Sequence, residues 1–118
     1  MSKREIQLLL EDISDAAKKI LSYTNSLTFD EFLKDEKTID AVVRNFEIIG
    51  EAANRIPGDF KVDHPEIEWK RIIAFRNRIV HDYFGIDYAM VWKIKNENIP
   101  ELVDFIDQAI KDLNKNPK

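Results

Sequence analysis

The sequence contains no cysteine, and this absence removes several kinds of site at once. Without a thiol, the chain has no disulfide scaffold, no zinc–thiolate site and no cysteine nucleophile. Histidine is almost as scarce, because only His64 and His81 are present and no H-E-x-x-H spacing occurs. We therefore expect neither a metal-dependent mechanism nor a cofactor.

Long hydrophobic runs are also missing. No stretch reaches the roughly 20 apolar residues that a membrane-spanning helix needs. Near the N-terminus the apolar residues are interrupted by Gln7 and Glu11, and no small-residue cleavage site follows. The length, 118 residues, suits a single domain with one core. We therefore expect one helical domain over residues 1–118, located in the cytoplasm and not associated with a membrane.

An excess of positive charge is absent as well, since the net charge is −4. This value argues against sequence-independent binding of nucleic acid over the whole surface. Between Lys70 and His81, however, there is no acidic residue, so this segment is locally basic. Lys70, Arg71 and Arg78 are candidates for RNA contacts, and the alternative is that they form a solvated helix face.

The apolar residues recur with a helical period along most of the chain. In the first segment they lie three and four apart, which predicts an amphipathic helix over about residues 3–25. The same pattern and helix-end signals predict three further long helices and two short ones: residues 39–56 before Pro57-Gly58, 66–84 before Gly85, 98 onward, and short helices after Thr28 and after Asp87. The fold class is therefore an all-α, up-and-down bundle of four main helices plus short helices.

Gly50 lies inside the apolar stripe of the second long helix. A glycine in the middle of a helix costs about 1 kcal/mol relative to alanine. We expect this cost to be offset by the close approach of a neighbouring helix.

Arg76 is out of place in the helix predicted over residues 66–84. With about 100° of rotation per residue, it falls near the centre of the apolar face of that helix. This face consists of Trp69, Ile72, Ile73, Ile79, Val80 and Tyr83. Because burying an unpaired guanidinium is costly, we expect an anionic partner, water in a cleft or a second chain beside Arg76. The simplest alternative is an ion pair with the second long helix, where Arg44, Glu47 and Glu51 share one edge.

Asn77 and His81 follow Arg76 closely, and the three side chains suit RNA cleavage without a metal. Such cleavage needs a base near the 2′-hydroxyl, an acid for the leaving 5′-oxygen and stabilisation of the pentavalent phosphorane. Histidine suits acid–base work because imidazole titrates near neutral pH, and arginine grips phosphate oxygens in a planar fork. On the predicted helix Asn77 and His81 share a ridge, so the amide can orient the imidazole or contact phosphate. Packing for His81 and solvation for Asn77 are the structural alternatives.

A family resemblance is found in the string Arg76-Asn77-Arg78-Ile79-Val80-His81-Asp82-Tyr83. It resembles the motif R-x-x-x-x-H-x-Y of the HEPN superfamily and, within it, of the HepT toxins of HepT–MntA toxin–antitoxin pairs. The similarity extends to the segments 41–53, 81–87 and 91–92, so it covers residues 39 to 102. Arg, Asn, His and Tyr of the motif are all present without departure.

The resemblance implies a HEPN-like homodimer that acts as a metal-independent endoribonuclease toxin, with Arg76, Asn77 and His81 as catalytic residues and both subunits lining one cleft. It also implies a partner, an MntA-like nucleotidyltransferase antitoxin, which transfers AMP to Tyr83. The residues favour a dimer independently, because one chain has a single histidine on this helix and a two-fold interface supplies two. The rival interpretation is a non-catalytic helical dimer that binds nucleotide or serves as the accessory subunit of a nucleotidyltransferase.

Overall fold

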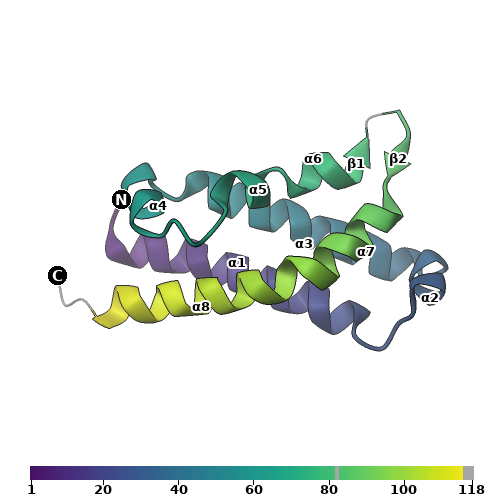
Figure 1. Cartoon of the computed structure of the whole chain (residues 1–118), viewed down its shortest axis with the longest axis horizontal. Helices are drawn as coiled ribbons and strands as arrows, with labels where there is room; N and C mark the ends of the chain where they lie inside the picture. Colours follow the sequence, from purple (N-terminus) through teal and green to yellow (C-terminus); the bar gives the residue numbers. More distant parts are fainter. Residues whose placement is uncertain (82, 116–118) are drawn as a thin grey trace.

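Three long helices lie side by side and form the body of the molecule (Figure 1). They are α1 (Lys3–Thr24), α3 (Glu36–Arg55) and α8 (Ile99–Lys115). The computed structural model describes residues 1–81 and 83–115, and within it α1 packs against both α3 and α8. None of the helices in these ranges is long and apolar enough to cross a membrane. The all-α class and the long helices predicted over 3–25, over 39–56 and from 98 onward are confirmed.

Side-chain caps explain where two of the helices begin. The predicted capping box of Thr28 and Glu31 is confirmed and opens α2 (Phe29–Leu33). Asp35 caps α3 by accepting hydrogen bonds from the backbone N–H and the hydroxyl of Thr38, at 3.1 and 2.8 Å. These bonds satisfy amide groups that the first helical turn leaves unpaired. They also stabilise the carboxylate, so the pKa of Asp35 lies below its ordinary value.

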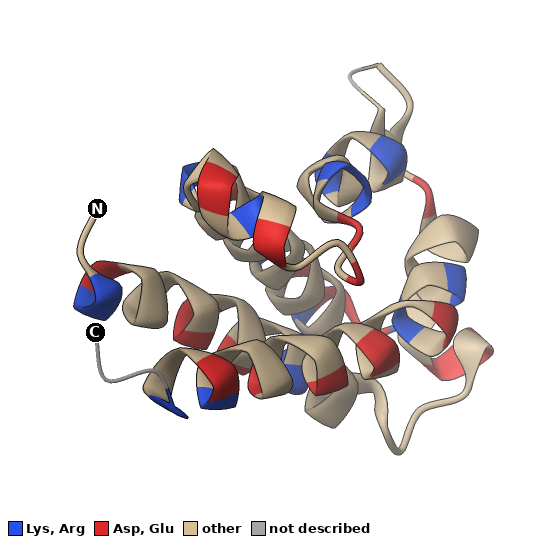
Figure 2. Cartoon of the chain, turned by 60° about the vertical axis from the view of Figure 1, so that its left-hand side comes forward, with Lys and Arg blue, Asp and Glu red and all other residues tan. Residues whose placement is uncertain are grey.

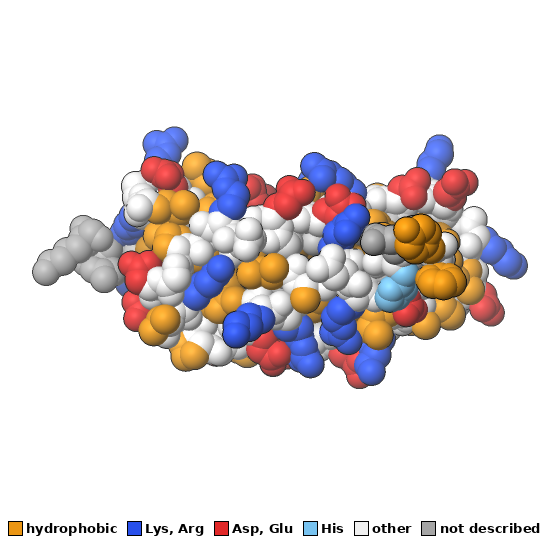
Figure 3. All heavy atoms as spheres, turned by 90° about the horizontal axis from the view of Figure 1, so that it is seen from above, with side chains coloured by type: hydrophobic (Ala, Val, Ile, Leu, Met, Phe, Trp, Pro, Cys, Tyr) orange, Lys and Arg blue, Asp and Glu red, His pale blue; other side chains and the backbone are white. Residues whose placement is uncertain are grey.

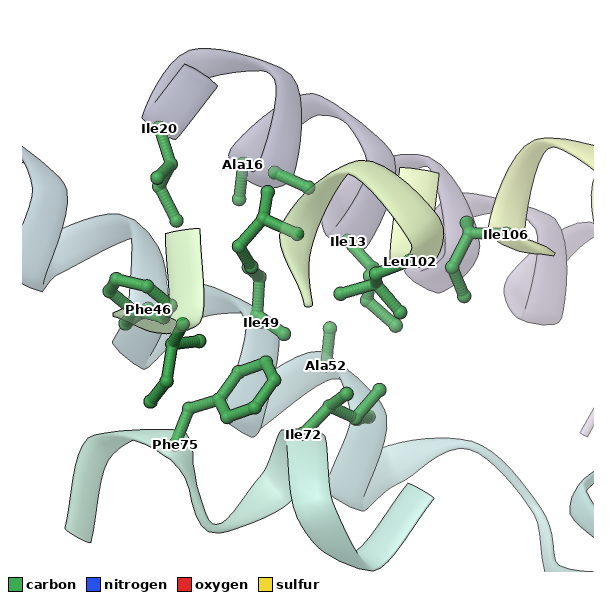
Figure 4. Close-up of a cluster of buried hydrophobic side chains, with 14 of the residues drawn as sticks. Ile13, Ala16, Ile20, Phe46, Ile49, Ala52, Ile72, Phe75, Leu102 and Ile106 are labelled. Carbon is green, nitrogen blue, oxygen red and sulfur yellow. The ribbon is translucent and has the colours of Figure 1, made fainter. Parts of the chain in front are cut away.

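The core lies between the long helices and residues 69–79, which pack on α3 (Figure 4). Ile13 of α1, Phe46 of α3 and Ile106 of α8 are fully buried and point into one cluster. Phe75, which lies in residues 69–79, packs edge-on against Phe46 with ring centroids 5.7 Å apart. Each such side chain contributes roughly 1.5–3 kcal/mol through its burial, so this cluster is the main source of stability.

The single helix predicted over residues 66–84 is wrong, because this part of the chain is broken into short elements. It is preceded by α4 and followed by α7, and the elements in order are α4 (Gly58–Asp63), α5 (Trp69–Ile73), α6 (Phe75–Ile79), β1 (Val80–His81), β2 (Gly85–Ile86) and α7 (Tyr88–Glu97). The two strands form an antiparallel hairpin, in which His81 pairs with Gly85. Asp82 of the motif string lies outside the described residues.

Local backbone contacts show why the helix does not continue. At Ala74 the N–H donates to the carbonyls three and four residues earlier, at 3.2 and 3.1 Å, which is the tightened turn of a helix end. Val80 is β-branched and adopts an extended conformation with φ −114° and ψ 119°. The N–H of Asp87 then donates to the carbonyl of Ile79 at 2.7 Å and ties the hairpin to the end of α6. Gly85, predicted to end a helix, lies in β2 with a φ of 79° that glycine adopts at little cost.

The break at Ala74 changes which side chains face the core. Ile72, Phe75 and Ile79 are buried on the α3 side, whereas Arg76 is exposed. The apolar stripe predicted around Arg76 is therefore wrong, because the helix that would form it is broken, whereas the exposure of Arg76 in a hollow agrees with the expectation of water in a cleft. Because Arg76 is exposed, its guanidinium is solvated and needs no buried anionic partner.

Gly50 confirms the predicted close approach of a neighbouring helix. It is buried in the middle of α3, and a Cβ added to it would lie 3.2 Å from the carbonyl oxygen of Ile73. That oxygen belongs to the last residue of α5. A side chain at Gly50 would push against the backbone of α5, so the glycine allows α5 to pack closely on α3.

Candidate active site

The hairpin after α6 carries His81 at one end of the molecule (Figure 1). Its side chain is 47% exposed, and its Nε2 lies 3.7 Å from Oδ2 of Asp87. At this separation the two groups form an ion pair when the imidazole is protonated, but not a close hydrogen bond. The imidazole is therefore open to solvent and faces a carboxylate.

Asp87 is itself held in place at the start of α7. Its Oδ1 caps the helix by accepting a hydrogen bond from the N–H of Met90 at 3.0 Å, which leaves Oδ2 to face His81. The sequence identifies Asp87 only as the residue before a helix. No signal in the sequence connects it with His81, because the register of the hairpin creates their contact.

Arg76 and Asn77 are exposed and line one hollow of about 330 Å³ between α6 and α3. His81 is not among the residues that line this hollow. One chain therefore brings Arg76 and Asn77 together in this hollow, and His81 lies on the hairpin that follows α6. The predicted ridge shared by Asn77 and His81 does not exist, because α6 ends at Ile79 and His81 lies in a strand.

Acidic residues of α3 line the same hollow. Glu47 forms an ion pair with Arg44 at 3.7 Å, and both Glu47 and Glu51 contribute to the wall next to Arg76. Within the described part of the chain, no ion pair joins Arg76 to either carboxylate. The guanidinium of Arg76 is therefore available for a ligand that enters the hollow.

Arg78 and Arg71 lie on the opposite side of the segment, toward α7. Nη2 of Arg78 lies 3.4 Å from Sδ of Met90, and Nη1 of Arg71 lies 3.0 Å from Oε2 of Glu68. Both arginines line a polar hollow of about 310 Å³, together with Lys93 of α7. Sequence reasoning missed Lys93, since only the packing of α7 on α6 places it beside the arginines.

Lys70, the third candidate for an RNA contact, lies in a different hollow. This hollow measures about 590 Å³ and is lined by Lys61, Lys70, Arg71 and Glu68 and by apolar side chains of α4 and α5. Arg71 lines both this hollow and the one beside α7, so these two basic surfaces are neighbours. Figure 3 shows lysine and arginine side chains distributed over this face of the molecule.

Tyr83 and Phe84 form the tip of the hairpin and are 96% and 89% exposed. The N–H of Phe84 donates to the carbonyl of His81 at 3.0 Å, which closes the turn. In Figure 3, hydrophobic side chains protrude at this end beside a histidine. The predicted position of Tyr83 on the apolar face of a helix is wrong, because the helix ends at Ile79. The tyrosine instead presents its whole side chain to solvent.

Trp92 and His64 have packing roles. Trp92 packs against Phe29 and Phe32, with ring centroids 5.6 and 5.1 Å apart. His64 stacks on Phe60, and its Nδ1 lies 3.1 Å from the carbonyl oxygen of that residue. No three His, Asp or Glu side chains in the described ranges are grouped so that they could hold a metal ion.

The fold and the site define an all-α bundle of the HEPN type, in which an exposed Arg–His segment is carried by a short helix and a hairpin. The model of the ribonuclease HepT-like family matches residues 13–109, which include the whole candidate site. The chain therefore belongs to the ribonuclease HepT-like family.

Several proteins of similar length are similar to this chain in sequence. A protein of Methanocaldococcus jannaschii, named as a candidate RNase, is 42% identical over 113 residues, which are 96% of this chain and 93% of the relative. A candidate ribonuclease HepT of Thermococcus cleftensis is 46% identical over 100 residues, 85% of this chain and 91% of the relative. A candidate RNase of Caldanaerobacter subterraneus is 36% identical over 93 residues, 79% of this chain and 83% of the relative. No solved structure matches the chain significantly.

Proposed function

We propose that this chain is a metal-independent endoribonuclease toxin that works as a homodimer. The observation that carries the proposal is the exposed imidazole of His81, which faces the fixed carboxylate of Asp87 at 3.7 Å. Membership of the ribonuclease HepT-like family, and relatives named as candidate RNases, support the same activity.

Cleavage begins when a base takes the proton of a 2′-hydroxyl. The 2′-oxygen bonds to the adjoining phosphorus, the bond from phosphorus to the 5′-oxygen breaks, and an acid protonates that leaving oxygen. His81 provides the acid–base groups, and Arg76 stabilises the charge of the phosphorane with its planar fork. Asn77, beside Arg76 in one hollow, donates to a phosphate oxygen. The products are a 2′,3′-cyclic phosphate and a free 5′-hydroxyl.

A second copy of the chain completes this site. One chain offers only His81 for proton transfer, because His64 is stacked on Phe60. A two-fold axis beside the hairpin supplies a second His81, so that one imidazole acts as base and the other as acid. The same axis brings the Arg76 hollow of one copy to His81 of the other, so that both groups act on one phosphate.

The activity is controlled at Tyr83, whose 96% exposure leaves its hydroxyl open to a second protein. An MntA-like nucleotidyltransferase catalyses attack of the phenolic oxygen on the α-phosphorus of ATP. The bond between the α- and β-phosphates breaks, pyrophosphate leaves, and the phenolic proton passes to solvent. The attached AMP adds bulk and negative charge two residues from His81, so it blocks the approach of RNA to the imidazole. RNA and ATP as reactants place the pair in the cytoplasm.

The decisive experiment is cleavage of bulk RNA in EDTA, with the ends identified chemically. The wild type is expected to leave 2′,3′-cyclic phosphates, and His81→Ala to lose about 10²-fold or more in rate, as is usual for a proton-transfer group. Helicity and dimer mass should be unchanged. Lys19→Ala, an exposed position on α1, is the control and should cleave normally. Wild-type rates in His81→Ala would refute the proposal.

The modification is tested by mass spectrometry after incubation with ATP and the transferase. Tyr83→Phe is expected to show no gain of an adenylate mass. Tyr23→Phe, which removes a partly exposed tyrosine on α1, should be modified like the wild type. A full mass gain on Tyr83→Phe would assign the modification to another residue.

A further inference from the structure

One face of α7 meets the site segment at successive points. Asp87, directly before the helix, lies 3.7 Å from His81. The Sδ of Met90 lies 3.4 Å from Arg78, and Lys93 shares a hollow with Arg78. Residues three apart lie on one side of a helix, and six residues rise about 9 Å. His81, Arg78 and Lys93 therefore follow one another along the boundary between α6 and α7.

Arg71 extends this line of cations. It lines the hollow of about 310 Å³ with Arg78 and Lys93, and Glu97 is the one carboxylate in that lining. Its ion pair with Glu68 is weak, because both side chains are largely exposed, at 48% and 64%. A phosphate can therefore replace the carboxylate beside Arg71. Figure 2 shows lysine and arginine positions both on the segment before the hairpin and on α7.

The two neighbouring hollows differ from this one. In the hollow beside α3, Arg76 is accompanied by Glu47 and Glu51, so this hollow suits the single phosphate that is cleaved better than a longer stretch of RNA backbone. The hollow around Lys70 shares Arg71 with the hollow beside α7, but its other walls come from α4 and α5. Of these three hollows, the one beside α7 is lined by Arg78 and Lys93, and α7 leads back to His81 through its capping residue Asp87.

We propose that this α6–α7 seam, defined by Arg71, Arg78 and Lys93, binds the RNA backbone next to the phosphate that is cleaved at His81. The inference rests on the proposed ribonuclease activity and specifies how the substrate is held. Arg78, supported by Met90, presents a fork to phosphate oxygens, and Lys93 adds a flexible point charge. Because backbone contacts carry no sequence information, the seam sets affinity and orientation of the strand and leaves base identity unread.

Binding to a strand that cannot be cleaved tests the seam separately from catalysis. The probe is a short, fluorescently labelled, fully 2′-O-methylated RNA, and its binding to the whole protein is followed by anisotropy at several salt concentrations. Lys93→Gln and Arg78→Gln are each expected to weaken binding several-fold. Each should also reduce the slope of log K against log salt by about 0.7, the value for one lost contact to a single strand. Lys19→Gln on α1 is the control and should change neither quantity.

In cleavage assays, the same two variants are expected to raise KM for a long strand, whereas Lys19→Gln should cleave that strand like the wild type. Unchanged affinity and salt slope in both variants would overturn the seam, even if the wild type cleaves RNA. An equal loss in Lys70→Gln would also overturn it, because binding would then reflect diffuse attraction. Unchanged RNA binding with lost binding of the nucleotidyltransferase would make the seam a protein-docking surface, contrary to the proposal. Seam-dependent binding without any cleavage would support the seam and refute the ribonuclease activity instead.

Discussion

The scaffold of α1, α3 and α8 and the site segment, residues 66–87, are built by different means. The scaffold helices run for 22, 20 and 17 residues and each buries a periodic apolar stripe. In the site segment, α5 and α6 have five residues each and the strands have two. Isolated elements of this length are not stable in water, so the segment depends on α3 and α7 for its shape.

This difference separates stability from chemistry. Side chains that hold the molecule together, such as Phe46 and Ile13, are fully buried in the scaffold. Arg76, His81 and Tyr83, which we assign to function, are exposed on the segment laid over it. Changes in one region are therefore expected to affect one property and leave the other nearly intact.

The largest expected effect compares two phenylalanines, one from each region. Phe46 is fully buried and Phe84 is 89% exposed. Phe46→Ala should lower the free energy of unfolding by about 3–5 kcal/mol, because it removes buried surface and leaves a cavity. Phe84→Ala should change it by less than about 0.5 kcal/mol. Urea denaturation measures both, and similar losses in the two variants would contradict the division between scaffold and site segment.

The next effect compares two helix-capping aspartates. Asp87 caps α7 and faces His81, whereas Asp35 caps α3. Asparagine caps a helix as well as aspartate does, so Asp87→Asn should keep the thermal midpoint. It should reduce kcat for RNA on the order of tenfold, or about 1.4 kcal/mol, since no carboxylate is left to orient the imidazole of His81 and stabilise its protonated form. Asp35→Asn should cleave RNA like the wild type, and equal rates for both variants would deny Asp87 this positioning role.

A smaller effect tests the contact between the two regions at Gly50. Gly50→Ala places a Cβ 3.2 Å from the backbone oxygen of Ile73. Overpacking costs about 1–3 kcal/mol, and the better helix propensity of alanine returns about 1 kcal/mol, so we expect a net loss of about 1 kcal/mol. Gly58→Ala is the control, because its Cβ would meet no atom within 4 Å. A gain in stability for Gly50→Ala would show that α5 moves away from α3 freely.

The smallest effect concerns the pH dependence of the scaffold. Hydrogen bonds from Thr38 lower the pKa of Asp35 below its ordinary value of 3.8. The folded state therefore binds this proton less readily than the unfolded state, and stability rises with pH in this window. The contribution is present above pH 3.8 and is lost as the pH falls through the lowered pKa of the folded protein. Thermal midpoints between pH 5 and pH 2 should thus fall more steeply for the wild type than for Asp35→Asn, with Asp40→Asn as the control for net charge.

Much of the scaffold was predictable from the sequence. The long helices, the capping box of Thr28 and Glu31, and the close approach at Gly50 were all found in the structure. The helices and the capping box depend on neighbours within a few residues, and Gly50 was recognisable as an exception in a repeated apolar pattern. The helix over residues 66–84 was predicted by the same rules and was wrong, because its apolar spacing is helical while the turn at Ala74 and the strand at Val80 interrupt it.

By itself, the sequence determined which chemical groups this protein has and which stretches become long helices, because composition and periodicity act locally. Only the tertiary structure decided where those groups lie. In the folded chain Arg76 is exposed, Asp87 lies 3.7 Å from His81, and Lys93 lines a hollow with Arg78. The physical reason is that five-residue helices and two-residue strands have too few internal hydrogen bonds to fix their own geometry, so the packing of α3 and α7 fixes it for them.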